Sequence, residues 1–419
     1  MNEKVIQYVW EKQLFIHDNL KTNCGKTIVI QYPGMLNKHQ GPDFIHARLI
    51  IDSQEWIGSV EIHKRTSDWY VHRHQHDANY TNVILHVVWQ HDSEEFIHSP
   101  VLELCSLIEN RVIYESSSAI TGNSLINCNN GLPMPVSKEM NEFLCALGFA
   151  RMQNKTNQII DLLKVYRGDW ETVTWLYVAK GFGSLVNADT FFALAQSIPF
   201  YLIRLYKYDQ EVMEAILYGQ SGLLNDQLKD EYPNRLLKIY TLIKQKFGLM
   251  HIANPLLFLR MRPSNFPTIR MSQLVSLYHK RQHVFRSIID GHDRFSMIDL
   301  MNITASAYWE DHVSFGRIGV PHQKSIGNAM ANNLIVNVFI PILLAYSTTI
   351  GDKQYKNTAL GWLHDLRAES NSILDQFKTA GFKIQTAFES QSILELHRQY
   401  CSKMLCNSCV HGRKLVIPN

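Results

Sequence analysis

The sequence lacks the features that mark secreted and membrane proteins. Its first residues, Met1 to Lys4, run straight into a helical pattern without the basic start and apolar stretch of a signal peptide. The most apolar segment, Leu334 to Tyr346, carries Asn337 and Pro341 and is shorter than the roughly 20 residues of a bilayer-spanning helix. We therefore expect a cytoplasmic protein with no membrane partner, in which this segment is a buried helix.

The sequence also has few cysteines and a small net charge. Seven cysteines, an odd number, do not suit the disulfide framework of a secreted protein. A net charge of +3 permits a nucleic-acid partner without arguing for one, because a local basic patch matters more than the total. With 419 residues, 46% of them hydrophobic, the chain is a globular protein of two or three domains.

The first part of the chain alternates between helical and strand patterns. Residues 3–17 have apolar side chains at helical spacing, and 68–80 are polar enough for a short helix rather than a strand. Strand patterns occupy residues 27–32, 44–51, 55–63 and 83–89. The predicted order is helix, three strands, helix, strand. We therefore predict a small mixed-sheet α/β domain over residues 1–120.

The remainder of the chain has a helical character. Residues 121–135 are rich in Asn, Gly and Pro, which is typical of a linker. Residues 136–400 show apolar side chains at helical spacing and no convincing strand, and residues 401–419 form a cysteine-containing tail. The predicted fold class is α+β/α, a small mixed-sheet α/β domain followed by a large all-helical domain.

Acidic and imidazole side chains gather at two of the predicted strands. Because side chains alternate along a strand, Glu61 and His63 point to the same face, and Asp43 begins the preceding strand. Mg²⁺ or Mn²⁺ takes one or two carboxylates together with waters and phosphate oxygens. A metal site on Asp43 and Glu61 is one interpretation; a turn cap at Asp43 and a Glu61–His63 pair on a solvated face is the other.

Pro42-Asp43 and, one strand later, Glu61-Ile62-His63 resemble the core of the PD-(D/E)XK nuclease superfamily in the same order of elements. The resemblance implies a DNA nuclease in which Asp43 and Glu61 bind Mg²⁺ or Mn²⁺. A lysine of that superfamily positions the nucleophilic water, and here His63 stands in its place. Either His63 activates the water, or a lysine comes from elsewhere, or catalysis has been lost. Glu11 would match the helix-borne acid of some members.

The chain also resembles, over most of its length, an uncharacterised bacterial family known as domain-of-unknown-function family 2851. The segments that carry this resemblance are Gly41-Pro42-Asp43-Phe44, Val60-Glu61-Ile62-His63, Ser67-Asp68-Trp69, Asn82 to Val88 and Arg262-Pro263-Ser264-Asn265-Phe266-Pro267. This resemblance implies no established function.

Histidines His72, His74 and His76 alternate after the third strand. In a helix only His72 and His76 would share a face, where with Asp68 or Asp77 they would suit Zn²⁺ and an unrelated zinc hydrolase. In an extended segment all three would line one side. We expect them instead to line a phosphate-binding cleft. A further histidine, His86, lies within an apolar strand and is expected to be a hydrogen-bonded core residue.

A second candidate metal site lies in the tail. Cys401, Cys406, Cys409 and His411 have a spacing that suits a zinc ion or an iron–sulfur cluster. Ordinary reduced thiols at the end of a helix explain the same spacing equally well.

Three arginines surround a proline-rich loop in the helical region. Arginine forks match phosphate oxygens, so Arg260, Arg262 and Arg270, with Lys64 beside the proposed site, are the predicted contacts to nucleic acid. Arginines that anchor the loop to helix carboxylates are the alternative. The leading hypothesis is thus a metal-dependent DNA nuclease; the competing one is a nucleic-acid-binding or assembly protein that kept the fold without catalysis.

Overall fold

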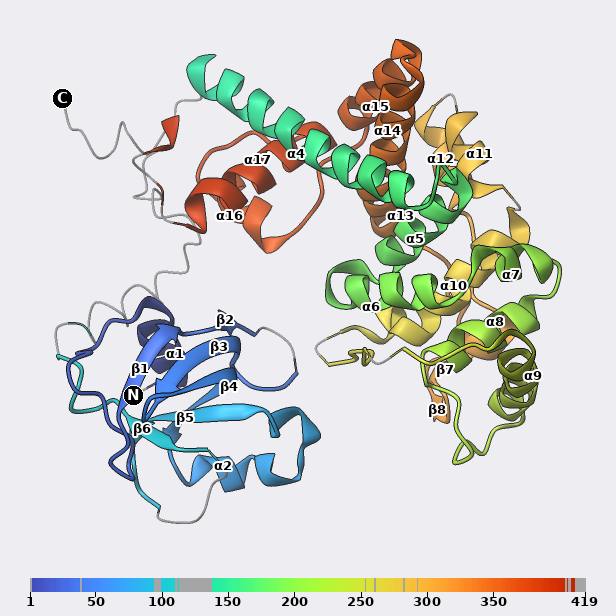
Figure 1. Cartoon of the computed structure of the whole chain (residues 1–419). Coiled ribbons are helices and arrows are strands. Elements are labelled where there is room, and N and C mark those ends of the chain that lie inside the picture. Colours follow the sequence, from blue (N-terminus) through green and yellow to red (C-terminus); the bar gives the residue numbers. More distant parts are fainter. Residues whose placement is uncertain are drawn as a thin grey trace. The chain divides into compact units, whose positions relative to one another are not determined.

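The chain divides into two compact units, Met1–Ser124 and Leu125–Asn419. The structure is a computed structural model (Figure 1) that describes residues 2–37, 40–93, 99–109, 112, 138–252, 254–259, 261–281, 283–291, 293–403, 405 and 408–410. The linker expected at residues 121–135 lies outside the described residues. Each unit is considered by itself below.

The first unit is built on one mixed sheet (Figure 1). Its elements are α1 (Glu3–Lys12), β1 (Ile28–Tyr32), β2 (Met35–Leu36), β3 (Phe44–Ile51), β4 (Gln54–Arg65), α2 (Asp68–Val71), the 3-10 turns η1 (His74–His76) and η2 (Ala78–Tyr80), β5 (Val83–Gln90) and β6 (Val101–Glu103). The strands lie in the order β1-β3-β4-β5-β6, and β2 pairs with β3. The pairs β1–β3 and β3–β4 are antiparallel, whereas β4–β5 and β5–β6 are parallel. The predicted mixed α/β arrangement is confirmed, with β2 and β6 in addition.

The two faces of the sheet differ in what covers them. On one face, Val60 and Ile62 of β4 belong to the same buried apolar cluster as Val5, Val9 and Trp10 of α1. This is the apolar stripe that the helical spacing of residues 3–17 predicts. Since β4 alternates regularly, its Glu61 and His63 point to the opposite face, which we call the polar face.

The second unit is a large helical domain. Its helices are α4 (Lys138–Val165), α5 (Trp170–Phe182), α6 (Ser184–Ser197), α7 (Phe200–Leu205), α8 (Gln210–Gln220), α9 (Glu231–Phe247), α10 (Pro267–Lys280), α11 (Val284–Ile289), α12 (Arg294–Leu300), α13 (Asn328–Leu334), α14 (Ile340–Ile350), α15 (Lys353–Asp365), α16 (Ser372–Thr379) and α17 (Ala387–Leu396). The short turns η3 (Pro263–Asn265) and η4 (Ala307–Glu310) are 3-10 helices, and η5 (Ile335–Phe339) and η6 (His397–Cys401) are π-helices.

The expectation of no strand in this region was wrong at one place. Strands β7 (His312–Ser314) and β8 (Arg317–Ile318) form an antiparallel hairpin. Each has at most three residues, too few for a period-two pattern to stand out in the sequence. The helical class of the unit is otherwise as predicted.

The predicted buried helix is confirmed. Residues Asn328–Ile350, which comprise α13, η5 and α14, form one helix that is long and apolar enough to span a membrane. In its most apolar window, 67% of the residues are buried inside the protein. Burial of this extent is what a core helix of a soluble protein shows, because its apolar side chains pack against neighbouring helices.

Candidate metal centre

Asp43 and Glu61 meet across the β3–β4 pair. The Asp43 backbone N–H donates to Glu61 Oε2 at 2.9 Å, and the Ile62 backbone N–H donates to Asp43 Oδ2 at 3.2 Å. Each carboxylate is thus held by the backbone next to the other one, where Phe44 pairs with Val60. The sequence expectation that the two strands would bring these carboxylates side by side agrees with this geometry.

The carboxylate pair carries strongly perturbed pKa values. Burial, together with the neighbouring Glu61 charge, raises the pKa of Asp43 to about 7. Burial raises the pKa of Glu61 to about 8, although the hydrogen bond from the Asp43 backbone opposes the rise. Among the described residues, no lysine or arginine forms a salt bridge with either carboxylate. Two buried acids without a cation between them are unfavourable when both are ionised, and this is the condition that a bound cation relieves.

Three imidazoles stand next to the pair. His63, His72 and His74 offer ring nitrogens that all lie within 4.8 Å of one another. The Nε2 atoms of His63 and His74 each lie 3.4 Å from Glu61 Oε1. The buried His74 Nε2 has no hydrogen-bond partner. A buried imidazole nitrogen without a hydrogen-bond partner that faces a carboxylate oxygen has the chemistry of a metal ligand.

A left-handed residue brings two of these histidines to the polar face. Helix α2 ends after one turn, and Arg73 has φ 58° before η1 begins. This turn reverses the chain between His72 and His74, so both rings face His63, with ring centroids 4.9 and 5.2 Å from it. Neither a continuous helix nor an extended strand would place them so.

Aromatic packing fixes the His74 ring. It stacks on Tyr80 of η2, with centroids 3.8 Å apart, and lies edge-on to Trp69 of α2 at 5.4 Å. The alternative zinc pair of His72 and His76 required a continuous helix, which this segment does not form. His76 is exposed and outside the group of potential ligands, and His74 lies beside His72 instead.

His63 is the central imidazole and is neutral. Burial, reinforced by the charges of neighbouring histidines, lowers its pKa to about 2. Its Nδ1 lies 2.9 Å from His86 Nε2, and its Nε2 lies 3.0 Å from His72 Nδ1, so one proton is shared along each contact. His86 is completely buried in β5 and hydrogen-bonded, as predicted. With both ring nitrogens engaged, His63 positions the neighbouring imidazoles, and with this pKa it is a weak proton acceptor.

The acid contributed by α1 is Glu3 rather than Glu11. The charge of Glu3 raises the pKa of both Asp43 and Glu61, and Gln7, one turn later, hydrogen-bonds the Asp43 side chain. Glu11 is instead paired with Lys12 at 3.0 Å. Glu3, Gln7 and Glu11 follow one another at four-residue spacing on one helix face. The sequence therefore predicted the correct face of α1, but not which turn of the helix lies next to the site.

The predicted nucleic-acid contacts fall in different environments. Lys64 is exposed near the site: burial raises the pKa of Glu3, and the charge of Lys64 is among those that oppose the rise. Arg262 is exposed. Arg270 is buried, and it donates to Asn265 Oδ1 at 2.6 Å and Gln273 Oε1 at 2.8 Å. It therefore anchors the loop before α10, which corrects its assignment as a surface phosphate contact. Arg260 lies outside the described residues.

The tail cysteines do not assemble a metal site among the residues that the structure describes. Cys409 is buried in an apolar cluster with Phe377 and Leu396, and Cys401 packs against that cluster. Neither belongs to a group of potential metal ligands. Cys406 and His411 lie outside the described residues.

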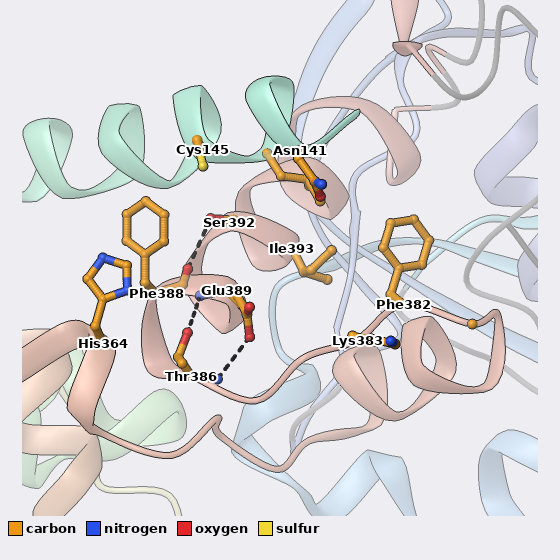
Figure 2. A pocket seen from close by; sticks show the side chains of 12 residues that line it. Asn141, Cys145, His364, Phe382, Lys383, Thr386, Phe388, Glu389, Ser392 and Ile393 are labelled. Atoms are coloured by element: carbon orange, nitrogen blue, oxygen red, sulfur yellow. Dashed lines mark hydrogen bonds between the residues drawn. The ribbon is translucent and has the colours of Figure 1, made fainter. Parts of the chain in front are cut away.

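The helical unit holds a separate pocket of about 690 Å³. Figure 2 shows Asn141 and Cys145 of α4 on one side of it, facing Phe388 and Ser392 of α17. Two of its polar groups are already engaged, because Thr386 and Glu389 form a reciprocal capping box at the start of α17. Its described lining contains no group of metal ligands, so the perturbed acids and imidazoles of the first unit remain the better candidate site.

Comparison with known proteins gives a family but no activity. No curated protein and no solved structure matches the chain. A family described as "Protein of unknown function (DUF2851)" matches residues 3–372, which includes the whole carboxylate–histidine cluster and most of the helical unit. The match confirms the resemblance to domain-of-unknown-function family 2851, whereas the comparisons give no support to the nuclease resemblance. The chain belongs to family 2851.

Proposed function

We propose that the protein is a divalent-metal-dependent phosphodiesterase that cleaves DNA. The observation that carries the proposal is the reciprocal Asp43–Glu61 pair, buried without a described basic partner and directly beside three imidazoles. The order of α1, the antiparallel strands, α2 and the parallel strand β5 also supports it, since this is the arrangement that the PD-(D/E)XK resemblance implies.

The donor set decides which metal fits best. Asp43, Glu61 and His74 offer carboxylate oxygens and an orphaned imidazole nitrogen, with His63 and His72 at hand. Mg²⁺ prefers an all-oxygen shell, whereas imidazole suits Mn²⁺ and Zn²⁺ better. The sequence left Mg²⁺ and Mn²⁺ open as the bound metal. We now propose a transition metal, with Mn²⁺ as the first choice for phosphodiester chemistry.

The side chains divide the work in a simple way. Asp43 and Glu61 hold the cation, which on binding would polarise a phosphodiester and lower the pKa of a bound water. His63 is neutral and hydrogen-bonded on both ring nitrogens, so it would keep His72 and His86 in place beside the cation. Glu3 and Gln7 orient Asp43 from α1. Rate enhancement then comes chiefly from positioning and charge neutralisation.

The test is cleavage of single- and double-stranded DNA by the full chain with Mn²⁺, Mg²⁺, Zn²⁺ or a chelator. We expect cleavage with Mn²⁺ that Asp43→Ala and Glu61→Ala each reduce by about 100-fold, on the order of the loss of a metal ligand or its support. Asp18→Ala is the matched control, because Asp18 is an exposed carboxylate of the same unit that lies outside β4 and outside the site. Cleavage that persists unchanged in both site variants would refute the proposal.

One observation favours a non-catalytic alternative. His63 occupies the position where a catalytic lysine is expected, and its depressed pKa makes it a weak base. On this alternative the protein binds Mn²⁺ and DNA, in the cytoplasm where we expect it to work, without turnover. Metal binding by calorimetry that depends on Asp43 and Glu61, with no cleavage under any condition, would establish it.

A further inference from the structure

The polar face of the sheet continues beyond the metal centre. At the other end of β4, Ile57 pairs with Arg48 of β3, and Arg48 pairs with Tyr32 of β1. These three side chains form a row across three strands. With Gln31 and His46 they line a shallow hollow of about 540 Å³. We call these five residues the sheet platform.

The sheet platform shares a face with the metal centre. Ile57, Ser59, Glu61 and His63 alternate along β4, which has no bulge of its own, so they point the same way. Four residues of strand separate Ile57 from Glu61, which corresponds to about 13 Å. A stacked strand of nucleic acid covers that distance with about four nucleotides, at about 3.4 Å each.

The chemistry of the sheet platform is that of a nucleic-acid contact. The side chain of Arg48 is exposed and, within the described part of the chain, forms no hydrogen bond or salt bridge. Tyr32 beside it is 41% exposed and Ile57 is 59% exposed. A guanidinium free to bind phosphate, next to an aromatic ring free to stack on a base, is how single strands are held without sequence preference.

The bulge at His46 adds to this arrangement. Its φ of 61° marks the extra residue that β3 carries between Phe44 and Ala47. The bulge places an exposed imidazole between the Asp43 end of β3 and Arg48. Bulges re-aim side chains near functional sites in this way.

We infer that the sheet platform binds the single-stranded segment of nucleic acid that flanks the scissile phosphate. This inference rests on the proposed nuclease function and names its substrate class: a nucleic acid with a single-stranded region, rather than an uninterrupted duplex. Arg48 contacts a phosphate, Tyr32 stacks on a base, and the strand then runs along β4 toward Glu61. A protein partner fits less well, because an unpaired arginine at the centre of the patch would have to be desolvated against it.

Binding can be measured apart from cleavage. The full chain is titrated into a fluorescein-labelled single-stranded oligonucleotide of about 12 nucleotides, long enough for the site sizes of single-strand binders, and into its duplex. Chelator is present throughout, and fluorescence anisotropy is the readout. Arg48→Ala and Tyr32→Ala are each expected to weaken single-strand binding about tenfold. Arg48→Ala also reduces the slope of log affinity against log salt by about 0.7, since one phosphate contact is lost.

Two control variants are matched to these changes. Trp56→Ala removes a partly exposed aromatic ring from the neighbouring position of β4, on the opposite face. Lys26→Ala removes an exposed positive charge next to β1. Neither is expected to change single-strand affinity by more than about twofold, since Trp56 lies on the opposite face and Lys26 precedes β1 and does not line the sheet platform. Circular dichroism verifies that every variant is folded.

The outcomes separate this inference from the proposed function. Weakened single-strand binding in both platform variants, with unchanged controls, supports it whether or not cleavage is observed. Wild-type affinity in both variants overturns it, and metal-dependent cleavage in the same protein would leave the proposed function standing. Preference of the wild type for the uninterrupted duplex overturns it as well. So does a dimer, measured by light scattering, that Arg48→Ala dissociates, because the face would then bind a second copy.

Discussion

Replacing Glu61 with glutamine should stabilise the metal-free protein and abolish its metal binding. The glutamine side chain of this variant retains an oxygen that accepts the Asp43 backbone N–H now bound by Glu61 Oε2. Its amide can donate to His74 Nε2, which has no partner in the wild type. The substitution therefore removes a buried charge while keeping the shape and the hydrogen bonds of the site.

The sign of the stability change follows from the raised pKa. Glu61 has a pKa of about 8 in the folded protein, against an ordinary value of 4.5. At a pH well below its ordinary pKa the carboxyl group is protonated in both states and contributes nothing. As the pH rises from the ordinary value toward the folded one, the unfolded chain releases this proton while the folded protein retains it, so the free energy of unfolding falls. Above the folded pKa the penalty is constant.

The size of the stability change depends on how much of the rise in pKa belongs to Glu61 alone rather than to the Asp43–Glu61 pair. One pKa unit corresponds to about 1.4 kcal/mol. Because Glu61 and Asp43 are coupled, we count only about one to two units, so that Glu61→Gln raises the unfolding free energy by about 1.4–3 kcal/mol at about pH 8.5. For a unit of this size, that is a rise in Tm of roughly 5–10 °C, with almost no difference at about pH 4.5.

The assay is differential scanning calorimetry of the full chain at about pH 4.5 and about pH 8.5, on either side of the window that the raised pKa opens. Each pH is measured in chelator and in Mn²⁺. Histidines of the site also titrate between native and unfolded states, but they do so in both proteins, and comparison at equal pH removes most of their effect. Mn²⁺ at about 100 times its dissociation constant should stabilise the wild type by about 2.7 kcal/mol and the variant hardly at all. The reasoning would be refuted if the Glu61→Gln variant in chelator were less stable than the wild type at the higher pH. It would also be refuted if the substitution changed the Tm by the same amount at both pH values.

Two further substitutions test packing in the helical unit. Arg270→Ala should lower the unfolding free energy by about 1–3 kcal/mol in urea titrations, since it leaves Asn265 without its buried partner, whereas exposed Arg262→Ala should change it by less than about 0.5 kcal/mol. Gly148→Val should lower the free energy of unfolding by about 1–3 kcal/mol or more, because a Cβ at this position of α4 meets the Phe388 ring of α17. A thermal melt in which the variant has the Tm of the wild type would contradict this close approach of the two helices.

Much of the first unit could be predicted because its strands carry strong local signals. The continuous apolar run of β5 identifies a strand buried on both faces, and alternation in β4 assigns Glu61 and His63 to one face. With Asp43 at the start of the neighbouring strand, pairing of β3 and β4 follows from their short connection. The three-residue β6 escaped because so short a strand has no pattern. Its parallel position beside β5 depends on tertiary pairing alone.

The histidine cluster was out of reach of the sequence for a different reason. Its geometry depends on Arg73 adopting a left-handed conformation, which a non-glycine residue takes only when the surrounding structure holds it there. The packing of Tyr80 on His74 adds to that constraint. Periodicity offered a helix or a strand for this segment, and the chain adopts neither. Periodicity also predicted which face of α1 carries acidic residues, but it could not predict that Glu3, rather than Glu11, lies near the carboxylates.

The Asp43–Glu61 site is a better first target for metal analysis than the tail cysteines. The family match covers Asp43, Glu61 and the three histidines, together with Arg48 of the sheet platform, and it ends at residue 372. The tail cysteines follow later, and the two that are described, Cys401 and Cys409, lie in or against an apolar cluster. Buried thiols in such surroundings are stable without a metal, whereas two buried carboxylates beside an orphaned imidazole are unfavourable without one. Metal analysis of Asp43→Ala is therefore the more informative first measurement, because its result bears on a site that lies within the segment the family shares.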